Sequence, residues 1–181
     1  MTIKKQAVFL DRDGVINECI FDKKINSNSP RKLEEFKILP KVSEALSLIR
    51  DMNFLSIIVT NQPDVARGKI NKKDVENIHK YLKNNFPIND IYVCYDSNNN
   101  SPYRKPNNMM LIDAAKKWNV SLSNSYLIGD RKKDIDAGKK SGCKTFFIDY
   151  NYDEQKPDNS DYIVKSLYEA VKLIRKLKNE N

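Results

Sequence analysis

The sequence lacks long hydrophobic runs. Its longest apolar stretches, such as Phe54–Val59 and Thr145–Ile148, are far shorter than the ~20 residues that a membrane-spanning helix needs. Residues 1–5 lead directly into a strand-like segment, without the apolar region or the small-residue cleavage site of a signal peptide. We therefore expect no membrane span and a cytoplasmic location.

Cysteine is also scarce. The three cysteines, Cys19, Cys94 and Cys143, are odd in number and widely spaced. They form neither the framework of a disulfide-rich protein nor a C-x-x-C metal or redox motif. We therefore expect reduced thiols.

The 181 residues are 40% hydrophobic and 31% charged, which is typical of a folded protein and too apolar for a disordered one. This length suits a single domain over residues 1–181 that folds without disulfides or a structural metal. The formal net charge of +8 suits an anionic partner, either a phosphorylated metabolite or nucleic acid. Because the lysines are dispersed and often lie near acids, a solvated surface is favoured over a nucleic-acid-binding stripe.

Short β-branched and aromatic runs alternate with segments of helical periodicity, a pattern typical of βαβ units around a parallel sheet. The fold class is therefore α/β. The expected strands are Ala7–Leu10, Phe54–Thr60, Asp90–Tyr95, Ser125–Ile128 and Lys144–Ile148. The expected helices are Lys41–Met52, Lys72–Asn85, Asn107–Trp118, Asp134–Ser141 and Lys165–Lys178.

Helix-end signals refine these boundaries. Pro40 suits a first helical turn, and Asn71 suits an N-cap whose side chain accepts from a free backbone N–H. Tyr150–Asp161 is polar and is expected to connect over the surface to the last helix. Val15–Leu39 and Asp96–Pro106 remain unassigned, and both follow the carboxyl ends of strands, where ligands bind in open α/β sheets.

Two carboxylates follow the first strand in Asp11-Arg12-Asp13-Gly14. Such a pair can bind a hard divalent cation, or it can divide the roles of nucleophile and acid/base between two acids. An isolated D-x-D-G is more often only a turn in which glycine supplies a positive φ. The motif therefore needs partners elsewhere in the chain.

Three further motifs supply such partners. The second strand ends in Thr60-Asn61-Gln62, a hydroxyl and two amides that could hold phosphoryl oxygens. Arg104-Lys105 precedes a helix, where cations could neutralise a transferring phosphoryl group, and the fourth strand ends in Gly129-Asp130, with Asp134 one helical turn later. Each motif alone would suit a turn, a surface pair or a helix cap, but coincidence explains the ordered set poorly.

Together these motifs resemble the haloacid-dehalogenase-like (HAD) phosphatases, which carry D-x-D-G, a strand-end Thr or Ser, a Lys and G-D-x-x-x-D in this order. The resemblance runs from Ala7 to about Ile148. It implies a Rossmann-like fold, with a central, mainly parallel sheet flanked by helices. The short segments after the first and third strands indicate that a large cap domain is missing.

The resemblance also implies roles for individual residues. Asp11 would be the nucleophile and a Mg²⁺ ligand, and Asp13 would be the general acid and base and bind Mg²⁺ through its backbone carbonyl. Asp130 would be the remaining protein ligand of Mg²⁺, while Asp134 would orient the ligands. Thr60 and Lys105 would hold phosphoryl oxygens. The candidates for binding the rest of the substrate are Asn61, Gln62, Arg67 and Arg104.

Within the superfamily, Leu10–Asn17, Ala66-Arg67-Gly68 and Arg104-Lys105-Pro106 look like the D-glycero-D-manno-heptose bisphosphate and histidinol-phosphate phosphatases. Heptose enzymes of this group commonly carry a zinc site of pattern C-x-H and C-x-C before Arg-Lys-Pro. Here Cys94 stands at the first of these places, but the other three are occupied by Asp96, Ser101 and Tyr103. A lone thiol cannot form a closed zinc site, so we expect no structural zinc and a differently shaped loop at 96–103.

The leading hypothesis is a Mg²⁺-dependent phosphatase of a small phosphorylated metabolite, foremost a heptose (bis)phosphate in surface-polysaccharide precursor synthesis, acting as a monomer. Histidinol phosphate is an alternative substrate. A polynucleotide end phosphatase is less favoured, because the chain shows no basic stretch interleaved with aromatic residues. A non-catalytic module that binds phosphate ligands would not need the full set of reactive residues. His79, on a helix outside every motif, is expected to be a surface or packing residue.

Overall fold

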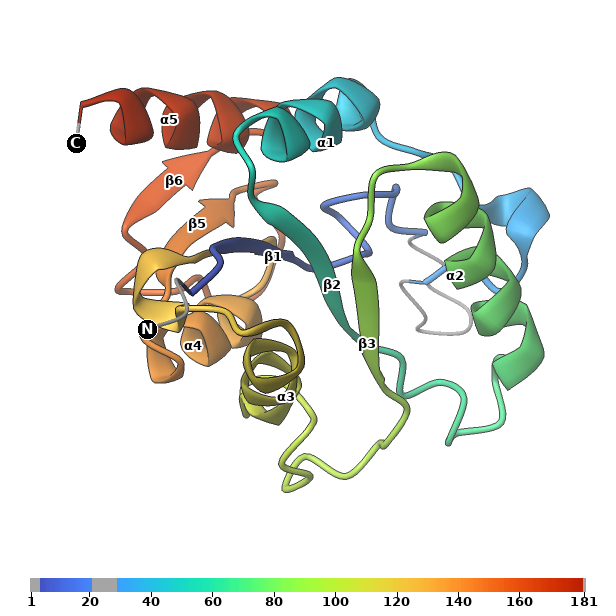
Figure 1. Cartoon of the computed structure of the whole chain (residues 1–181). Coiled ribbons are helices and arrows are strands. Elements are labelled where there is room, and N and C mark those ends of the chain that lie inside the picture. The colour runs from blue at the N-terminus through green and yellow to red at the C-terminus, as the bar shows by residue number, and fades with distance from the viewer. Residues whose placement is uncertain (1–3, 21–28, 181) are drawn as a thin grey trace.

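The computed structural model describes residues 4–20 and 29–180, and in them six strands form one sheet in the order β3-β2-β1-β4-β5-β6 (Figure 1). Every neighbouring pair is parallel. The strands are β1 (Ala7–Leu10), β2 (Leu55–Asn61), β3 (Asp90–Cys94), β4 (Tyr126–Gly129), β5 (Lys144–Ile148) and β6 (Tyr162–Val164). The helices are α1 (Val42–Asp51), α2 (Lys72–Asn85), α3 (Met109–Trp118), α4 (Lys132–Lys140) and α5 (Leu167–Asn179), with short 3-10 helices at η1 (Leu33–Glu35) and η2 (Leu122–Asn124).

Helices cover both faces of the sheet, with α1 and α5 above it and α3 and α4 below it in the view of Figure 1. The central strand β1 is buried along its whole length and alternates between the two sides. Val8 and Leu10 pack with α1, α2 and α5, whereas Ala7 and Phe9 pack with α3 and α4. This burial on both faces explains the continuous apolar sequence of the strand.

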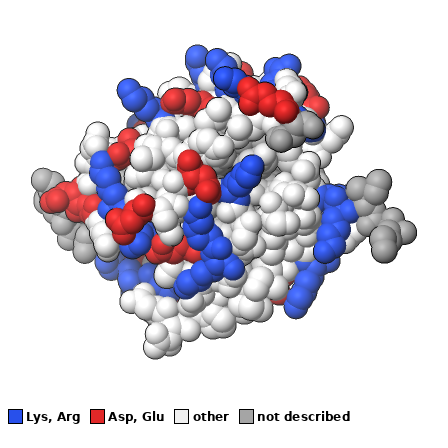
Figure 2. Space-filling model, turned by 90° about the vertical axis from the view of Figure 1, so that its left-hand side faces the viewer, with Lys and Arg blue, Asp and Glu red and all other residues white. Residues whose placement is uncertain are grey.

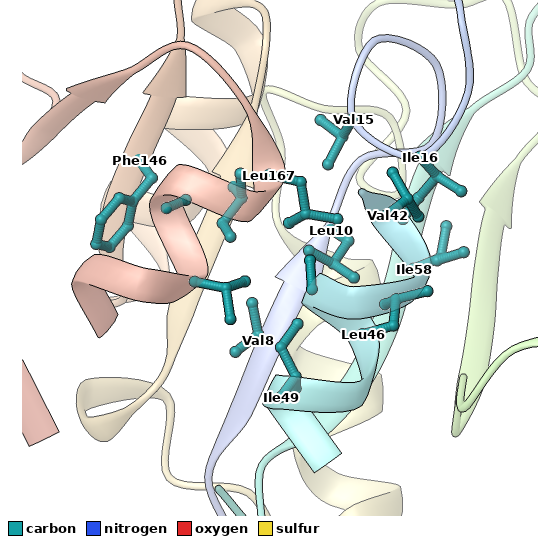
Figure 3. Close-up of a cluster of buried hydrophobic side chains, with 14 of the residues drawn as sticks. Val8, Leu10, Val15, Ile16, Val42, Leu46, Ile49, Ile58, Phe146 and Leu167 are labelled. Atoms are coloured by element: carbon teal, nitrogen blue, oxygen red, sulfur yellow. The ribbon is translucent and has the colours of Figure 1, made fainter. Parts of the chain in front are cut away.

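The larger core cluster lies between the sheet and α1. In Figure 3 the side chains of Leu46 and Ile49 on α1 point toward Val8 and Leu10 on β1. Ile16, which follows β1, joins the same cluster and is fully buried. The segment after β1 is therefore anchored in the core before the chain reaches the surface.

The predicted α/β class, the parallel sheet and the helix order are confirmed. β1, β5 and α2 have the predicted bounds, and most other elements differ by one or two residues at an end. β6 was missed because a strand of three residues carries almost no periodicity. Asp161, just before it, accepts hydrogen bonds from the backbone N (2.7 Å) and Oγ1 (2.8 Å) of Thr145 on β5, which fixes the pairing of these strands.

Two predicted helix starts were wrong, and a third prediction was confirmed in position but not in its hydrogen bond. Pro40 lies outside α1, because the N-cap is Lys41, which has a φ of 59°. Asn71 is the N-cap of α2, but its side chain makes no capping hydrogen bond; its backbone carbonyl accepts from Asp74 and Val75 instead. α4 begins at Lys132 rather than Asp134, since the Asp134 carboxylate caps the helix by accepting from the N–H of Arg131 (3.0 Å).

The segments after β1 and β3 are too short to form a large cap domain. The first contains η1 and an isolated bridge between Asn17 and Ile38, although its residues 21–28 lie outside the described part of the chain. The second, before α3, has no helix or strand over residues 95–108. In the described ranges, no helix is both long and apolar enough to cross a membrane.

One buried carboxylate ties three elements together. Asp90, at the start of β3 and 6% exposed, accepts from Lys83 of α2 (3.1 Å) and from Lys117 (2.7 Å) and Trp118 (3.0 Å) of α3. Burial raises the pKa of Asp90, but the hydrogen bonds from Lys117, Trp118 and Lys83 outweigh it and hold the pKa well below the ordinary value of 3.8. Asp90 therefore stabilises the fold while it is ionised.

We predict that Asp90→Asn lowers the free energy of unfolding at pH 7 by about 2 kcal/mol, since charge-assisted hydrogen bonds are lost. In the wild type, the Asp90 contribution is present above the unfolded pKa, near 3.8, and is lost as the pH falls toward the lower folded pKa. The variant should thus lose less stability than the wild type below about pH 4. Urea denaturation from pH 7 to pH 3 measures this, with Asp158→Asn, an exposed acid, as the control. Equal stability of both variants at pH 7 would contradict the assignment.

Candidate active site

The site forms where β1 and β4 end side by side. The N–H of Asp11 donates to the carbonyl of Ile128 (3.0 Å), which continues the pairing of the two strands by one residue. Gly14 then turns the chain with a φ of +84°, and a Cβ there would overlap the Asp130 carboxylate. The glycine of the D-x-D-G motif therefore serves both the turn and the close approach of Asp130.

Three acids gather at this point. Oxygen atoms of Asp11, Asp130 and Asp134 lie within 4.8 Å of one another, and the residues are 7%, 2% and 0% exposed. They come from the ends of β1 and β4 and from the first turn of α4. Gly129 leaves room for this arrangement, since a Cβ there would overlap the side chain of Asp134.

Lys105 balances part of this negative charge. Its Nζ lies 2.8 Å from Asp11 Oδ1 and 2.7 Å from Asp134 Oδ1, and it donates to the carbonyl of Val59 (2.7 Å). Burial lowers the pKa of Lys105, but the carboxylates of Asp11 and Asp134 raise it above the ordinary value. The lysine is therefore charged, and Asn61 holds its backbone by bonding both its N–H (3.1 Å) and its carbonyl (3.0 Å).

Lys105 and Arg131, whose Nε lies 3.3 Å from Asp130 Oδ2, compensate only part of the negative charge of the cluster. Burial first and Asp134 second raise the pKa of Asp11, and burial with Asp134 and Asp11 raises the pKa of Asp130 well above its ordinary value. Among the described residues, the buried Asp130 Oδ1 has no hydrogen-bond partner. A buried carboxylate oxygen that has no hydrogen-bond partner, beside two other acids, fits a hard divalent cation, which prefers oxygen ligands.

Asp13 lies in a different environment from the three clustered acids. Its carboxylate accepts from Arg12 Nη2 (3.0 Å to each oxygen), Asn17 (2.8 Å), Ser29 (2.8 Å) and Gln62 (2.9 Å). Burial raises the pKa of Asp13, but Arg12 and these donors outweigh it and lower the pKa. Several donors therefore fix this carboxylate beside the nucleophile candidate.

A cavity of about 570 Å³ opens over the acids. Six of the predicted residues line it: Asp11, Asp13, Asn61, Arg67, Arg104 and Asp130. The other four, Thr60, Gln62, Lys105 and Asp134, are buried behind this lining, at 2% exposure or less. Gln62 donates to Thr60 Oγ1 (3.0 Å), so it links the strand-end hydroxyl to Asp13.

The rest of the cavity lining mixes basic and acidic residues. Arg131, Lys132 and Lys133 contribute from the start of α4, and Arg67 and Arg104 contribute from two loops. The acids Asp64, Asp136 and Glu154 also line the cavity. Burial and then the charge of Arg67 lower the pKa of Arg104, and both side chains line the cavity. An anion bound between them would relieve the repulsion between their charges.

The loop at 96–103 is built from its own polar side chains. Asp96 Oδ1 accepts from the N–H of Asn98 (2.8 Å), and Asn98 Oδ1 accepts from the N–H of Asn100 (3.0 Å). Arg104 closes the loop by donating to Asn99 Oδ1 (3.1 Å) and to the carbonyl of Asp96 (3.1 Å). Side-chain and backbone hydrogen bonds thus hold Arg104 in place in this loop, where heptose enzymes of the group commonly carry zinc ligands.

Four residues at the site had no predicted role there. Arg12, Asn17 and Ser29 bind Asp13, and His79 binds Arg12 Nη1 (3.1 Å). Asn17 lies in the segment Leu10–Asn17 that resembles the family, and this could have identified it as a site residue. Ser29 and His79 lie far from any motif, and only the folded chain brings them near Asp13.

Comparison with known proteins agrees with this geometry. Residues 102–170, which include Lys105, Asp130 and Asp134, match a family model described as HAD-hydrolase-like. The chain is 30% identical to the D-glycero-alpha-D-manno-heptose-1,7-bisphosphate 7-phosphatase of Photorhabdus laumondii, over 94% of this chain and 97% of that protein. It is 31% identical to the enzyme of the same name from Burkholderia mallei, over 81% and 80% of the two chains.

Solved structures show the same fold. The D,D-heptose 1,7-bisphosphate phosphatase of B. bronchiseptica, crystallised with magnesium and phosphate, superposes with a TM-score of 0.80 at 21% identity, covering 95% of this chain and 99% of that one. Two observations lead to a single assignment. The chain is similar to these relatives over most of their length, and the acids, the lysine and the strand-end threonine lie in one place. The chain belongs to the HAD-like hydrolases and is one of their phosphatases.

Proposed function

We propose that this chain is a Mg²⁺-dependent phosphomonoester hydrolase that acts through an aspartyl phosphate on Asp11, with a heptose bisphosphate as the leading substrate. The observation that carries the proposal is the cluster of Asp11, Asp130 and Asp134 with Lys105 at the base of a cavity that Arg67 and Arg104 also line. The choice of substrate is supported by the relatives, which are named as heptose-1,7-bisphosphate 7-phosphatases. We further propose a cytoplasmic monomer, as expected from the sequence.

The carboxylates of Asp11 and Asp130 and the backbone carbonyl of Asp13 would hold the Mg²⁺ ion. Asp134 suits the role of orienting them, because its two oxygens already face Lys105 (2.7 Å) and the N–H of Arg131 (3.0 Å). When bound, the cation would screen the repulsion between Asp11 and the phosphate and stabilise charge on the phosphoryl oxygens.

In the first half of the reaction, a carboxylate oxygen of Asp11 attacks phosphorus and the bond to the leaving oxygen breaks. Asp13 gives a proton to that oxygen, so the product leaves as an alcohol. Because its donors lower its pKa in the free protein, Asp13 takes up this proton once the negatively charged phosphate lies beside it. In the second half, Asp13 removes a proton from water, which attacks the phosphorus, releases inorganic phosphate and restores the Asp11 carboxylate. Lys105 and Thr60 stabilise the charge on the phosphoryl oxygens.

Arg67 and Arg104 are the best candidates to bind the far end of a bisphosphate. Both line the cavity, and each is held by the protein: Arg67 by Asp64 (3.1 Å) and Arg104 by Asn99 (3.1 Å). Asn61 and Gln62 remain candidates for the substrate, although both also position neighbouring groups. Guanidinium groups suit this role, because they bind phosphate oxygens in pairs.

A nucleic-acid substrate is less well supported. On the face shown in Figure 2, Lys and Arg side chains stand beside Asp and Glu side chains instead of forming one continuous stripe. A backbone-tracking groove would need such a stripe. Phosphorylated oligonucleotides therefore serve as a comparison class in the test below.

The decisive experiment is a panel of phosphate esters assayed for phosphate release with Mg²⁺. It contains both anomers of heptose bisphosphate, heptose monophosphates, histidinol phosphate, glycerol phosphates and end-phosphorylated oligonucleotides. We expect a heptose bisphosphate to give the highest kcat/KM, and Asp11→Asn to lower it by about a thousandfold or more, since enzymes typically supply at least this acceleration. A folded Asp11→Asn variant with the wild-type rate would refute the mechanism, and no turnover of any ester would favour a binding module.

A second prediction concerns the metal site. Asp130→Asn removes one of three mutually repelling acids, so we expect the metal-free variant to unfold at a higher temperature than the metal-free wild type. Mg²⁺ should raise the Tm of the wild type, because it binds only the folded chain, and should raise that of the variant much less. Thermal unfolding with and without millimolar Mg²⁺ measures both effects. Asp136→Asn, a cavity-lining acid outside the cluster, is the matched control, and an equal Mg²⁺ effect in Asp130→Asn would exclude Asp130 as a ligand.

A third prediction concerns Arg104. Arg104→Met should raise KM for a bisphosphate by about tenfold or more, because a charge-assisted contact to the far phosphate is lost. It should change KM little for p-nitrophenyl phosphate, which has no second phosphate. Asn99→Ala, which removes one of the two contacts that hold Arg104, should show a weaker form of the same pattern. Equal KM increases for both substrates would mean that Arg104 does not bind the second phosphate.

A further inference from the structure

Arg12 is fully buried and does not contribute to the lining of the cavity. A buried guanidinium group needs partners for its N–H donors, because arginine is otherwise found near water. Since Arg12 lies between the two aspartates of the motif but outside the cavity lining, its partners indicate its role.

Those partners lie on two sides. Toward the site, Nε is 3.2 Å from Asp13 Oδ1, and Nη2 is 3.0 Å from each carboxylate oxygen of Asp13. On the other side, Nη1 lies 3.1 Å from Nε2 of His79, on α2. Figure 1 shows α2 beside the segment that follows β1, which is how two residues far apart in the sequence come to be neighbours.

The protonation of His79 settles the direction of this contact. Burial first and Arg12 second lower the pKa of His79 to about 3, so its ring is neutral at pH 7. Arginine can only donate. Nε2 of His79 is therefore the acceptor, and the single ring proton is on Nδ1.

We propose that His79 and Arg12 form a positioning pair for Asp13, in which His79 fixes Arg12 and Arg12 aims the Asp13 carboxylate at the leaving oxygen and the attacking water. This inference rests on the acid/base role proposed for Asp13. The helix gives the pair a rigid base, because its neighbours Ile78 and Leu82 are fully buried in the core. Arg12 and His79 themselves stay out of the chemistry.

The other contacts of Asp13 also predict how strongly the loss of the His79 contact affects the reaction. Asn17, Ser29 and Gln62 hold the Asp13 carboxylate as well. Loss of the His79 contact therefore loosens Asp13 without releasing it. We expect about a tenfold loss in the acid step, a part of the hundredfold or greater contribution that general acids make.

The test compares two replacements of His79. Gln places an amide oxygen near the position of Nε2 and keeps the acceptor, whereas Leu fills the space without an acceptor. We expect His79→Leu to lower kcat/KM about tenfold for the best sugar phosphate of the panel but less than about threefold for p-nitrophenyl phosphate, whose leaving group needs little protonation. His79→Gln should restore most of the loss. Equal losses on both substrates, or a Gln variant as impaired as Leu, would overturn the proposal.

Two controls separate the possible causes. Leu82→Ala, on the same buried side of α2, should lower stability without any dependence on the leaving group. Asp13→Asn should show the strongest dependence. If Asp13→Asn shows none, the acid role of Asp13 fails and the inference with it; if Asp13→Asn shows it and His79→Leu does not, only the inference fails.

The pH dependence of stability supplies a readout independent of activity. His79 binds a proton near its ordinary pKa of 6.5 in the unfolded chain but only near pH 3 in the folded one. The stability of the wild type should therefore fall as the pH drops from about 6.5 toward 3, and His79→Gln should lack this part of the slope. If His79→Leu does not fold, His79→Met replaces it. Identical slopes for the wild type and His79→Gln would show that His79 is not the buried neutral acceptor that the pair requires.

Discussion

Repulsion among three buried carboxylates is the constraint on which the rest of the site depends. Asp11, Asp130 and Asp134 lie within 4.8 Å of one another and are almost inaccessible to water, so their charges are poorly screened. Lys105 lies between Asp11 and Asp134, and Arg131 lies 3.3 Å from Asp130, so two cations face three acids. In the proposed reaction, Asp11 must attack a phosphate that is itself an anion, which is possible only where positive charge surrounds both groups. The imbalance thus creates a place for a divalent cation and, with it, for the phosphate.

The parallel sheet makes this crowding possible. β1 and β4 are neighbours in register, so the residues that follow them emerge at the same edge, although more than a hundred positions separate them in the chain. Gly14 and Gly129 then allow the acids to approach, because a Cβ at either position would occupy the space of a carboxylate. The free energy of the packed core, with β1 buried on both faces, offsets the cost of holding like charges together.

The sequence predicts the parts of this arrangement that depend on strand order. Apolar runs located β1 and β5, and the motifs after four strands identified the acids, the lysine and the threonine, because parallel strands carry such residues to one edge. Contacts between distant parts of the chain leave no such pattern in the sequence. His79 sits on an amphipathic helix, where a buried polar side chain looks like any packing residue, and its partner Arg12 occupies the variable position of D-x-D-G. The strand β6 is too short for periodicity to reveal.

Motif chemistry also says little about the direction in which a side chain points. Asn61 and Gln62 were singled out for the substrate, yet Asn61 holds the backbone of Lys105 and Gln62 links Thr60 to Asp13. Much of the polar sequence near the acids thus positions the reacting groups, and these contacts do not depend on which ester is bound. In the proposed function, discrimination among esters falls to Arg67 and Arg104, and Arg104 is held by the loop at 96–103. If these roles hold, the reaction and the choice of substrate are built from separate parts of the chain, so a change in that loop would alter the substrate while the chemistry at Asp11 is kept.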